Sequence, residues 1–209
     1  MLRPARVVAA VVLAVLAGGF VLPGPARADG PMRLDGQVTD EVGALDGRAA
    51  EVTAALDRLR AEGGLQLFVV YVRSFDGTPA QEWADQTATR SDLGRRDAVL
   101  AVATHDRAYA YAFDTGFPLT DTQLDVVATV AIEPALSAND WAGAAIAGAD
   151  GYRAVLAGQP VPSPRIRPGE ADPGGGGGGA GTWIAGAACL LLVAGGVVLV
   201  LWLLRRRRP

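Results

Sequence analysis

The chain has 209 residues and a formal net charge of −3, with 19 basic and 22 acidic side chains. Its one cysteine and one histidine exclude a disulfide framework and any metal centre that needs two histidines. All 22 acidic residues lie between Asp29 and Asp172, together with only 12 of the basic residues, so this segment carries a net charge of −10. Such a segment repels nucleic acid and favours cations.

The first 28 residues have the features of a secretory signal peptide. Arg3 and Arg6 precede the apolar run of residues 7–22, and Ala26-Arg27-Ala28 offers small residues for cleavage. An uncleaved N-terminal anchor is the alternative interpretation. We therefore expect a domain over residues 29–157 that begins after export.

The first helix and the first strand of this domain are predicted by two different patterns. Residues 48–61 carry apolar side chains at three- and four-residue steps, with Asp46 as the expected cap and Gly63-Gly64 as the end. Residues 65–72 (LQLFVVYV) are nearly all apolar, which is typical of a strand covered on both faces.

A second helix and a hairpin follow. Thr78, with Pro79 and Gln81 behind it, predicts a capping box and a helix to about Arg90. Residues 98–103 form a second buried run, and residues 108–113 alternate aromatic side chains with alanine. We expect the last two segments to pair as an antiparallel hairpin. Two residues that face each other in this hairpin should have numbers that sum to about 211.

The last two helices are predicted from their starts. Thr120 and Gln123 repeat the capping-box pattern and open a helix to about Ala131, after which Pro134 interrupts. Asn139 is the expected cap of a final helix that ends at Gly158.

The order of these elements predicts the fold class. The first two strands are separated by a helix and should be parallel, whereas the second and third form the hairpin. The expected fold is therefore α/β: a small α/β/α sandwich with a mostly parallel sheet and one antiparallel hairpin, followed by a C-terminal transmembrane helix.

The C-terminal part is divided into a linker, a membrane span and a basic tail. Residues 158–181 hold five prolines and then a run of glycines, which predicts a tether. Residues 182–204 are apolar and long enough, at about 1.5 Å per residue, to cross a bilayer as a helix. Four arginines in the tail, residues 205–209, orient that helix with its end in the cytoplasm. The expected location is the cell membrane, with one span and an extracytoplasmic domain.

Short motifs spread over residues 35–155 resemble the TPM domain family, also called the TPM phosphatase or thylakoid-lumen 18.3-like domain. The matching stretches are Val38-Thr39-Asp40 with Gly43-Ala44-Leu45, Asp97-Ala98-Val99-Leu100, Asp106-Arg107, and Gly116 with Leu119-Thr120-Asp121. The resemblance implies an α/β/α sandwich with an acidic surface pocket. It also implies divalent-cation binding in some members and acid phosphatase activity in some plant members.

Two stretches depart from the family pattern. Ala98-Val99 stands where the family has Asn-Gly, and Asp114-Thr115-Gly116-Phe117-Pro118 lacks one glycine and one acidic residue of the family's Gly-x-Gly-x-Glu. A pocket that depends on close backbone approach would be altered there. Catalysis is affected by this change more than the fold is.

Acidic residues gather at both ends of the predicted hairpin. Asp97 and Asp106 are separated by nine residues of extended strand, roughly 30 Å, so one ion does not reach both. Two candidate metal clusters follow: Asp40, Glu41, Asp76 and Asp106 at the carboxyl end of the sheet, or Asp97, Asp114 and Asp121 at the other end. Carboxylates without histidine or cysteine suit calcium or magnesium.

Each of these residues also has a structural interpretation. Any single aspartate can be a cap or a turn residue, and Asp121 fits the start of a helix. Arg107 could hold a phosphate or neutralise Asp106, and His105 is expected to be an exposed turn residue.

Two functions are compatible with these features. One is a membrane-tethered binding or accessory module with an envelope protein as its partner and a divalent cation, calcium or magnesium, as its cofactor. The other is a metal-assisted acid phosphatase acting on phosphate esters. The sequence supplies no nucleophile–base pair, and it predicts no nucleic-acid partner.

Overall fold

The computed structural model describes residues 30–174 of the chain. The predicted signal peptide, membrane span and basic tail lie outside this range. Within it, no helix combines the length and apolar character needed to cross a membrane. The longest, α6, has 16 residues.

A four-stranded mixed sheet forms the centre of the domain. Its strands are β1 (Val38–Asp40), β2 (Gln66–Val72), β3 (Asp97–Ala103) and β4 (Ala108–Phe113), and they lie side by side in sequence order. The β1–β2 and β2–β3 pairs are parallel, and β3–β4 is antiparallel. The hairpin pairs Ala98 with Phe113, as the predicted sum of 211 requires. Strand β1 was not predicted, because three residues are too few to show a strand pattern.

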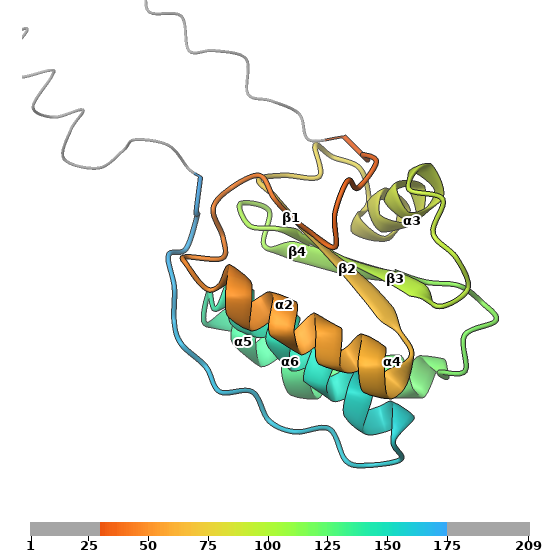
Figure 1. The fold of residues 1–209 in the computed structure, drawn as a ribbon. Coiled ribbons are helices and arrows are strands. Elements are labelled where there is room, and N and C mark those ends of the chain that lie inside the picture. Colours follow the sequence, from red (N-terminus) through yellow and green to blue (C-terminus); the bar gives the residue numbers. More distant parts are fainter. Residues whose placement is uncertain (1–29, 175–209) are drawn as a thin grey trace, which may run out of the picture.

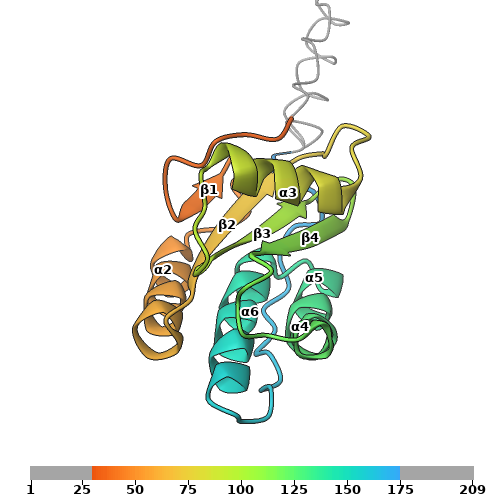
Figure 2. The ribbon, with the colours of Figure 1, turned by 90° about the vertical axis from the view of Figure 1, so that its right-hand side faces the viewer.

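Helices cover both faces of this sheet (Figures 1 and 2). On one face lies α3 (Ala80–Arg90); on the other lie α2 (Ala49–Arg58), α4 (Asp121–Val127), α5 (Glu133–Ser137) and α6 (Trp141–Leu156). Helix α2 continues as a π-helical turn, Leu59–Gly63, and α4 continues into α5 through another, Ala128–Ile132. The predicted α/β sandwich with a mostly parallel sheet is therefore confirmed for the described residues.

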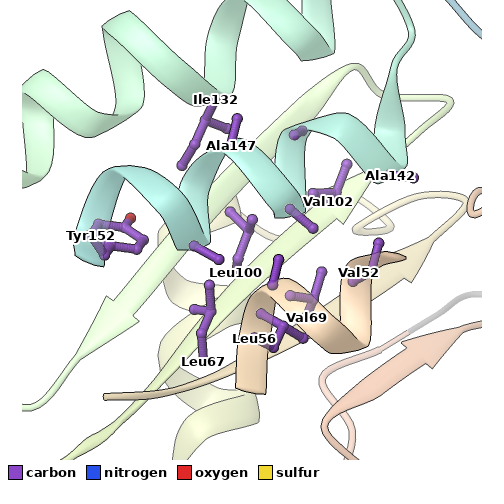
Figure 3. Close-up of a cluster of buried hydrophobic side chains, with 14 of the residues drawn as sticks. Val52, Leu56, Leu67, Val69, Leu100, Val102, Ile132, Ala142, Ala147 and Tyr152 are labelled. Atoms are coloured by element: carbon purple, nitrogen blue, oxygen red, sulfur yellow. The ribbon is translucent and has the colours of Figure 1, made fainter. Parts of the chain in front are cut away.

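Each face of the sheet has its own hydrophobic core. The larger one joins β2 and β3 to α2 and α6, and Figure 3 shows Leu67, Val69 and Leu100 of the sheet directed at Leu56 and the alanines of α6. The smaller one packs Trp83 of α3 against Phe75, with ring centroids 5.0 Å apart. The alternation of β2 and β3 side chains between the two cores explains why both strands read as continuous apolar runs.

Three of the four predicted helix caps differ from those in the structure. Asp46 has a positive φ and makes no cap, so α2 starts after Arg48. Pro79 takes the cap position of α3 in place of Thr78 and removes the expected capping box. Asp140, not Asn139, caps α6 by accepting a hydrogen bond from the Gly143 N–H.

The fourth cap, the Thr120–Gln123 capping box, is confirmed. At Pro134 the helical path does not stop, because the proline lies in the first turn of α5, where its missing N–H costs little. The misplaced caps are all one or two residues from the predicted positions. Of the three helices with misplaced caps, only α6 has two good capping residues side by side, Asn139 and Asp140, so that tertiary contacts select between them. Helices α2 and α3 start after Arg48 and Pro79, which make no side-chain cap.

The described part of the linker, residues 158–174, lies against the domain; we call it the strap. It runs from the end of α6 back along the helices toward the carboxyl ends of the parallel strands (Figure 1, blue). The Glu170 carbonyl accepts a hydrogen bond from Trp141 Nε1 at 2.8 Å, and the Arg167 N–H donates to Asp140 at 2.6 Å. Val161 packs on the larger core. These residues are therefore part of the folded domain and not a free tether.

Candidate functional site

The parallel strands bring three loops together at one end of the sheet. The loops are residues 41–48 after β1, residues 73–79 after β2 and the hairpin turn 104–107 after β3. The register places Asp40 opposite Tyr71, and Val72 opposite Ala103. Open α/β sheets usually bind ligands at this end. We call this group of loops the carboxyl-end site.

The two predicted acidic clusters fall at opposite ends of the sheet. Asp40, Glu41, Asp76 and Asp106 belong to the carboxyl-end site, whereas Asp97, Asp114 and Asp121 lie at the other end. The strand register thus separates the two sets as the hairpin geometry predicted.

Asp40 holds the loop after β1. Its carboxylate accepts hydrogen bonds from the N–H groups of Val42 (3.3 Å), Ala44 (2.9 Å) and Leu45 (3.0 Å). Three backbone donors on one carboxylate occupy most of its acceptor positions. The neighbouring Glu41 is exposed, and its own N–H donates to the Tyr71 carbonyl.

Asp106 joins the hairpin turn to the loop after β2. Its Oδ2 accepts from the Ser74 hydroxyl at 2.9 Å and from the Phe75 N–H at 2.7 Å. The Ser74 hydroxyl in turn accepts from the N–H of Asp76, which has a φ of +52°. Asp106 and Asp76 therefore act in a turn network, and the Ser74 hydroxyl donates to the Asp106 carboxylate and not to the His105 imidazole.

His105, Arg73 and Asp172 form an ion-pair group at the edge of this site. Asp172 of the strap lies 3.1 Å from the Arg73 guanidinium and 3.2 Å from His105 Nδ1. As predicted, His105 is an exposed residue of the turn. No local pattern pointed to Ser74, Arg73 or Asp172, because only the tertiary fold brings them to the turn.

Arg107 turns away from Asp106. Its φ is +53°, and its guanidinium donates to Asn139 Oδ1 at 2.8 Å. It also lines a cavity of about 220 Å³ beside Tyr109 and Glu133. Burial and the hydrogen bond to Glu133 raise the pKa of Tyr109, so its hydroxyl stays protonated at neutral pH.

The carboxylates at the other end of the sheet have local partners as well. Asp97 accepts from the Gly94 N–H, and Asp114 accepts from the Gly116 N–H, both at 2.8 Å. Asp121 lies in the first turn of α4, where a negative charge is favourable. All three residues fit their turn or helix-start interpretation.

No preassembled metal site appears in residues 30–174. Nowhere in this range do three or more His, Cys, Asp or Glu side chains group so that they could hold an ion. Asp40, Asp97 and Asp114 instead accept from backbone N–H groups of their own loops, and Asp106 accepts from the loop after β2. Calcium or magnesium would have to take most of its ligands from backbone carbonyls and water, so the described carboxylates do not fit a dedicated cation site. Cation binding stays a prediction.

Fold and site together define a class: a small α/β/α domain with acidic, hydrogen-bonded loops at the carboxyl end of a mixed sheet. The TPM domain model matches residues 38–155, more than half of the chain, and the chain belongs to that family. This confirms the resemblance inferred from the short motifs.

Two similar sequences are proteins of Mycobacterium tuberculosis. The chain is 47% identical over 144 residues to the UPF0603 proteins MT2410 and Rv2345 of two Mycobacterium tuberculosis strains. The match covers 68% of this chain and 22% of each relative, so it spans about a fifth of their length.

Two solved structures have a similar fold. The N-terminal domain of the cg2496 protein from Corynebacterium glutamicum has 30% identity and a TM-score of 0.52, and the match covers 62% of this chain and 85% of that one. An N-terminal domain from P. gingivalis has 22% identity and a TM-score of 0.51, with coverage of 58% and 82%. At that identity, the second supports the fold alone.

Proposed function

We propose that this TPM domain is a membrane-anchored binding or accessory module that presents its carboxyl-end site to an envelope protein at the outer surface of the membrane. The observation that carries the proposal is the position of the strap. Asp172 is held by Arg73 and His105, and Gly174 lies beside Val42, so the described chain ends at the carboxyl-end site.

The sequence beyond the strap supports this orientation. Only eight residues separate Gly174 from Trp183, the first apolar residue of the span predicted at residues 182–204. Eight residues reach at most about 28 Å when fully extended. The carboxyl-end site therefore faces the bilayer at short range, close to the extracytoplasmic parts of membrane proteins.

The carboxyl-end site also offers a surface suited to a protein partner. Glu41, Asp76 and His105 are exposed on loops that internal hydrogen bonds hold in place. A cavity of about 250 Å³ lies between the loop after β1, the start of α6 and the strap. Rigid loops bind a partner with a small loss of conformational entropy.

Photo-crosslinking tests this orientation. A photoreactive amino acid at Glu41 or Asp76 is expected to crosslink to one defined membrane protein in intact cells. The matched control at Asp121, exposed at the other end of the sheet, should not. Equal crosslinking from the two ends, or none from Glu41 and Asp76, would contradict the proposal.

The second candidate, the metal-assisted phosphatase, has one observation in its favour: Ser74, His105 and several carboxylates share the carboxyl-end site. Turnover of a generic phosphate ester by the full chain, with magnesium or calcium, tests it. Activity that disappears in Asp106→Ala or Asp97→Ala would support a phosphatase. We expect no turnover above that of these variants, because the Ser74 hydroxyl and His105 are bonded to different carboxylates.

A further inference from the structure

The strap covers a second cavity, away from the carboxyl-end site. This cavity has a volume of about 560 Å³ and lies between α2, α6 and residues 162–167 of the strap. Figure 1 shows the strap passing along these two helices. We call this space the arginine cavity, because its charged lining is mainly arginine.

The charge of the arginine cavity is opposite to that of the domain. Residues 30–174 contain 12 arginines and 21 acidic residues, a net charge of −9. Two acidic residues line the cavity, Glu51 and Asp150. Against them stand five of the 12 arginines: Arg48, Arg58, Arg153, Arg165 and Arg167. Two further carboxylates lie against these arginines, because Asp140 accepts from Arg48 and Glu62 accepts from Arg153 at 3.0 Å. Five arginines against four carboxylates leave a local charge of +1, which favours anions over cations there.

The four carboxylates pair with four of the arginines and leave the fifth, Arg165, unpaired. Glu51 accepts hydrogen bonds from both Arg48 and Arg167, and Asp150 lies within 3.9 Å of Arg58 and 3.5 Å of Arg153. Arg165 makes no ion pair or side-chain hydrogen bond with any residue of the described chain.

One buried donor of the cavity also lacks an acceptor. Arg153 Nε is buried, and residues 30–174 offer it no hydrogen-bond partner. A buried N–H without an acceptor is costly and rare in folded proteins. The Nε atom is enclosed by the protein, so the free hydrogen-bonding capacity that a ligand can reach is that of Arg165, which is exposed at the cavity and has no carboxylate partner among the described residues. An anionic group would complete the cavity there.

We propose that the arginine cavity binds a phosphate group carried by a small molecule or by a lipid headgroup. Guanidinium groups donate paired N–H bonds that match phosphate oxygens. A phosphoryl monoester brings close to two negative charges and three acceptor oxygens, which suits arginines that converge from three segments. Ser163 adds a hydroxyl to the lining.

The ligand would also hold the strap in place. Arg165 and Arg167 come from the strap. On the helical side, Arg48 precedes α2, Arg58 ends α2 and Arg153 lies in α6. A phosphate bridging the two sides ties the strap to the helices. Occupancy of the cavity therefore favours the docked strap.

Calorimetric titration of the full chain with inorganic pyrophosphate tests the proposal. The chain is placed in nanodiscs of zwitterionic lipid, with EDTA and matched chloride, so that neither cations nor ionic strength contribute. We expect saturable binding that weakens about tenfold in Arg165→Gln, the loss of about one charged hydrogen bond. Arg60→Gln is the matched control, because Arg60 is exposed and lines no cavity described here; it should bind as the unchanged chain does.

A repeat in nanodiscs of anionic phosphatidylglycerol identifies the source of the phosphate. Unchanged affinity for pyrophosphate points to a soluble ligand, and weaker affinity, from competition by headgroups, points to a lipid; either supports the phosphate site. The proposal is overturned if pyrophosphate gives no saturable binding, or if Arg60→Gln weakens it as much as Arg165→Gln does.

Discussion

The carboxyl-end site and the arginine cavity use their charges in opposite ways. At the carboxyl-end site, Asp40 accepts from N–H groups of its own loop, and Asp106 accepts from the N–H and O–H groups of the neighbouring loop after β2. In the arginine cavity, five arginines face four carboxylates, and Arg165 has no carboxylate partner among the described residues. The comparison teaches that the number of charged residues does not locate a ligand site; the hydrogen-bonding capacity left over after folding does.

Asp140 lies between the two regions, and its substitution should lower the free energy of unfolding more than the other substitutions below. Its side chain is only 1% exposed, and it accepts from Arg48 and from the N–H groups of Gly143 and Arg167. Asp140→Ala leaves Arg48 without its buried partner, so we expect a loss of about 3–5 kcal/mol in the free energy of unfolding. Urea-induced unfolding followed by tryptophan fluorescence measures it.

The control for this prediction is an exposed ion pair. Asp92→Asn removes the charge that pairs with Arg33 and tolerates the positive φ of this position, and both side chains are more than half exposed. We expect a change below about 1 kcal/mol. If the two variants lose the same free energy, Asp140 is not the structural link between α6, the residue before α2 and the strap.

A smaller loss is expected at the carboxyl-end site. Asp106→Ala removes the bonds to Ser74 and Phe75 and should lower the free energy of unfolding by about 2 kcal/mol. Because these bonds are internal, the loss should be the same in millimolar calcium and in EDTA. Calcium that stabilises the unchanged chain, but not Asp106→Ala, would show instead that Asp106 is a cation ligand.

Two buried tyrosines test the same contrast with uncharged groups. The Tyr71 hydroxyl donates to the Trp141 carbonyl at 2.8 Å, whereas the buried Tyr152 hydroxyl has no partner in the described chain. Tyr71→Phe should cost about 1 kcal/mol, and Tyr152→Phe should be neutral or stabilising, since it removes an unsatisfied polar group. Thermal unfolding of both variants measures the difference; an equal cost would mean that the Tyr152 hydroxyl has a partner in solution.

The smallest expected effect is a pH-dependent loosening of the contact between Glu51 and the strap. Desolvation alone would raise the pKa of Glu51, but the hydrogen bonds and charges of Arg167 and Arg48 outweigh it and lower the pKa below the usual value of 4.5. The contact between Glu51 and Arg167 is therefore fully favourable above that pH and is lost as the pH falls through the lowered pKa.

Hydrogen exchange at the strap amides, residues 163–170, measures this effect. At pH 6, the strap amides of the unchanged chain should exchange more slowly than those of Glu51→Gln. In acid, below the lowered pKa of Glu51, the two proteins should exchange at the same rate. A difference that persists below the lowered pKa would show that Glu51 does not hold the strap through its charge.

The sequence by itself predicted the strands β2, β3 and β4, the hairpin register and the helices between them. Apolar runs and turn residues act over a few positions, so they are readable locally. It also placed the two acidic sets at opposite ends of the sheet, because the length of a strand fixes how far its ends are separated. The TPM family followed from short motifs in the right order.

Only the tertiary structure decided how these residues are used. Asp40 and Asp106 became loop-holding acceptors because their neighbours in the fold are N–H and O–H groups, some of them 31 or 32 residues away in sequence. The strap was read as a tether because proline and glycine suit one, yet it packs on α2 and α6 and brings Arg165 and Arg167 opposite Arg153. Contacts between segments this far apart depend on the packed core, which no local pattern encodes.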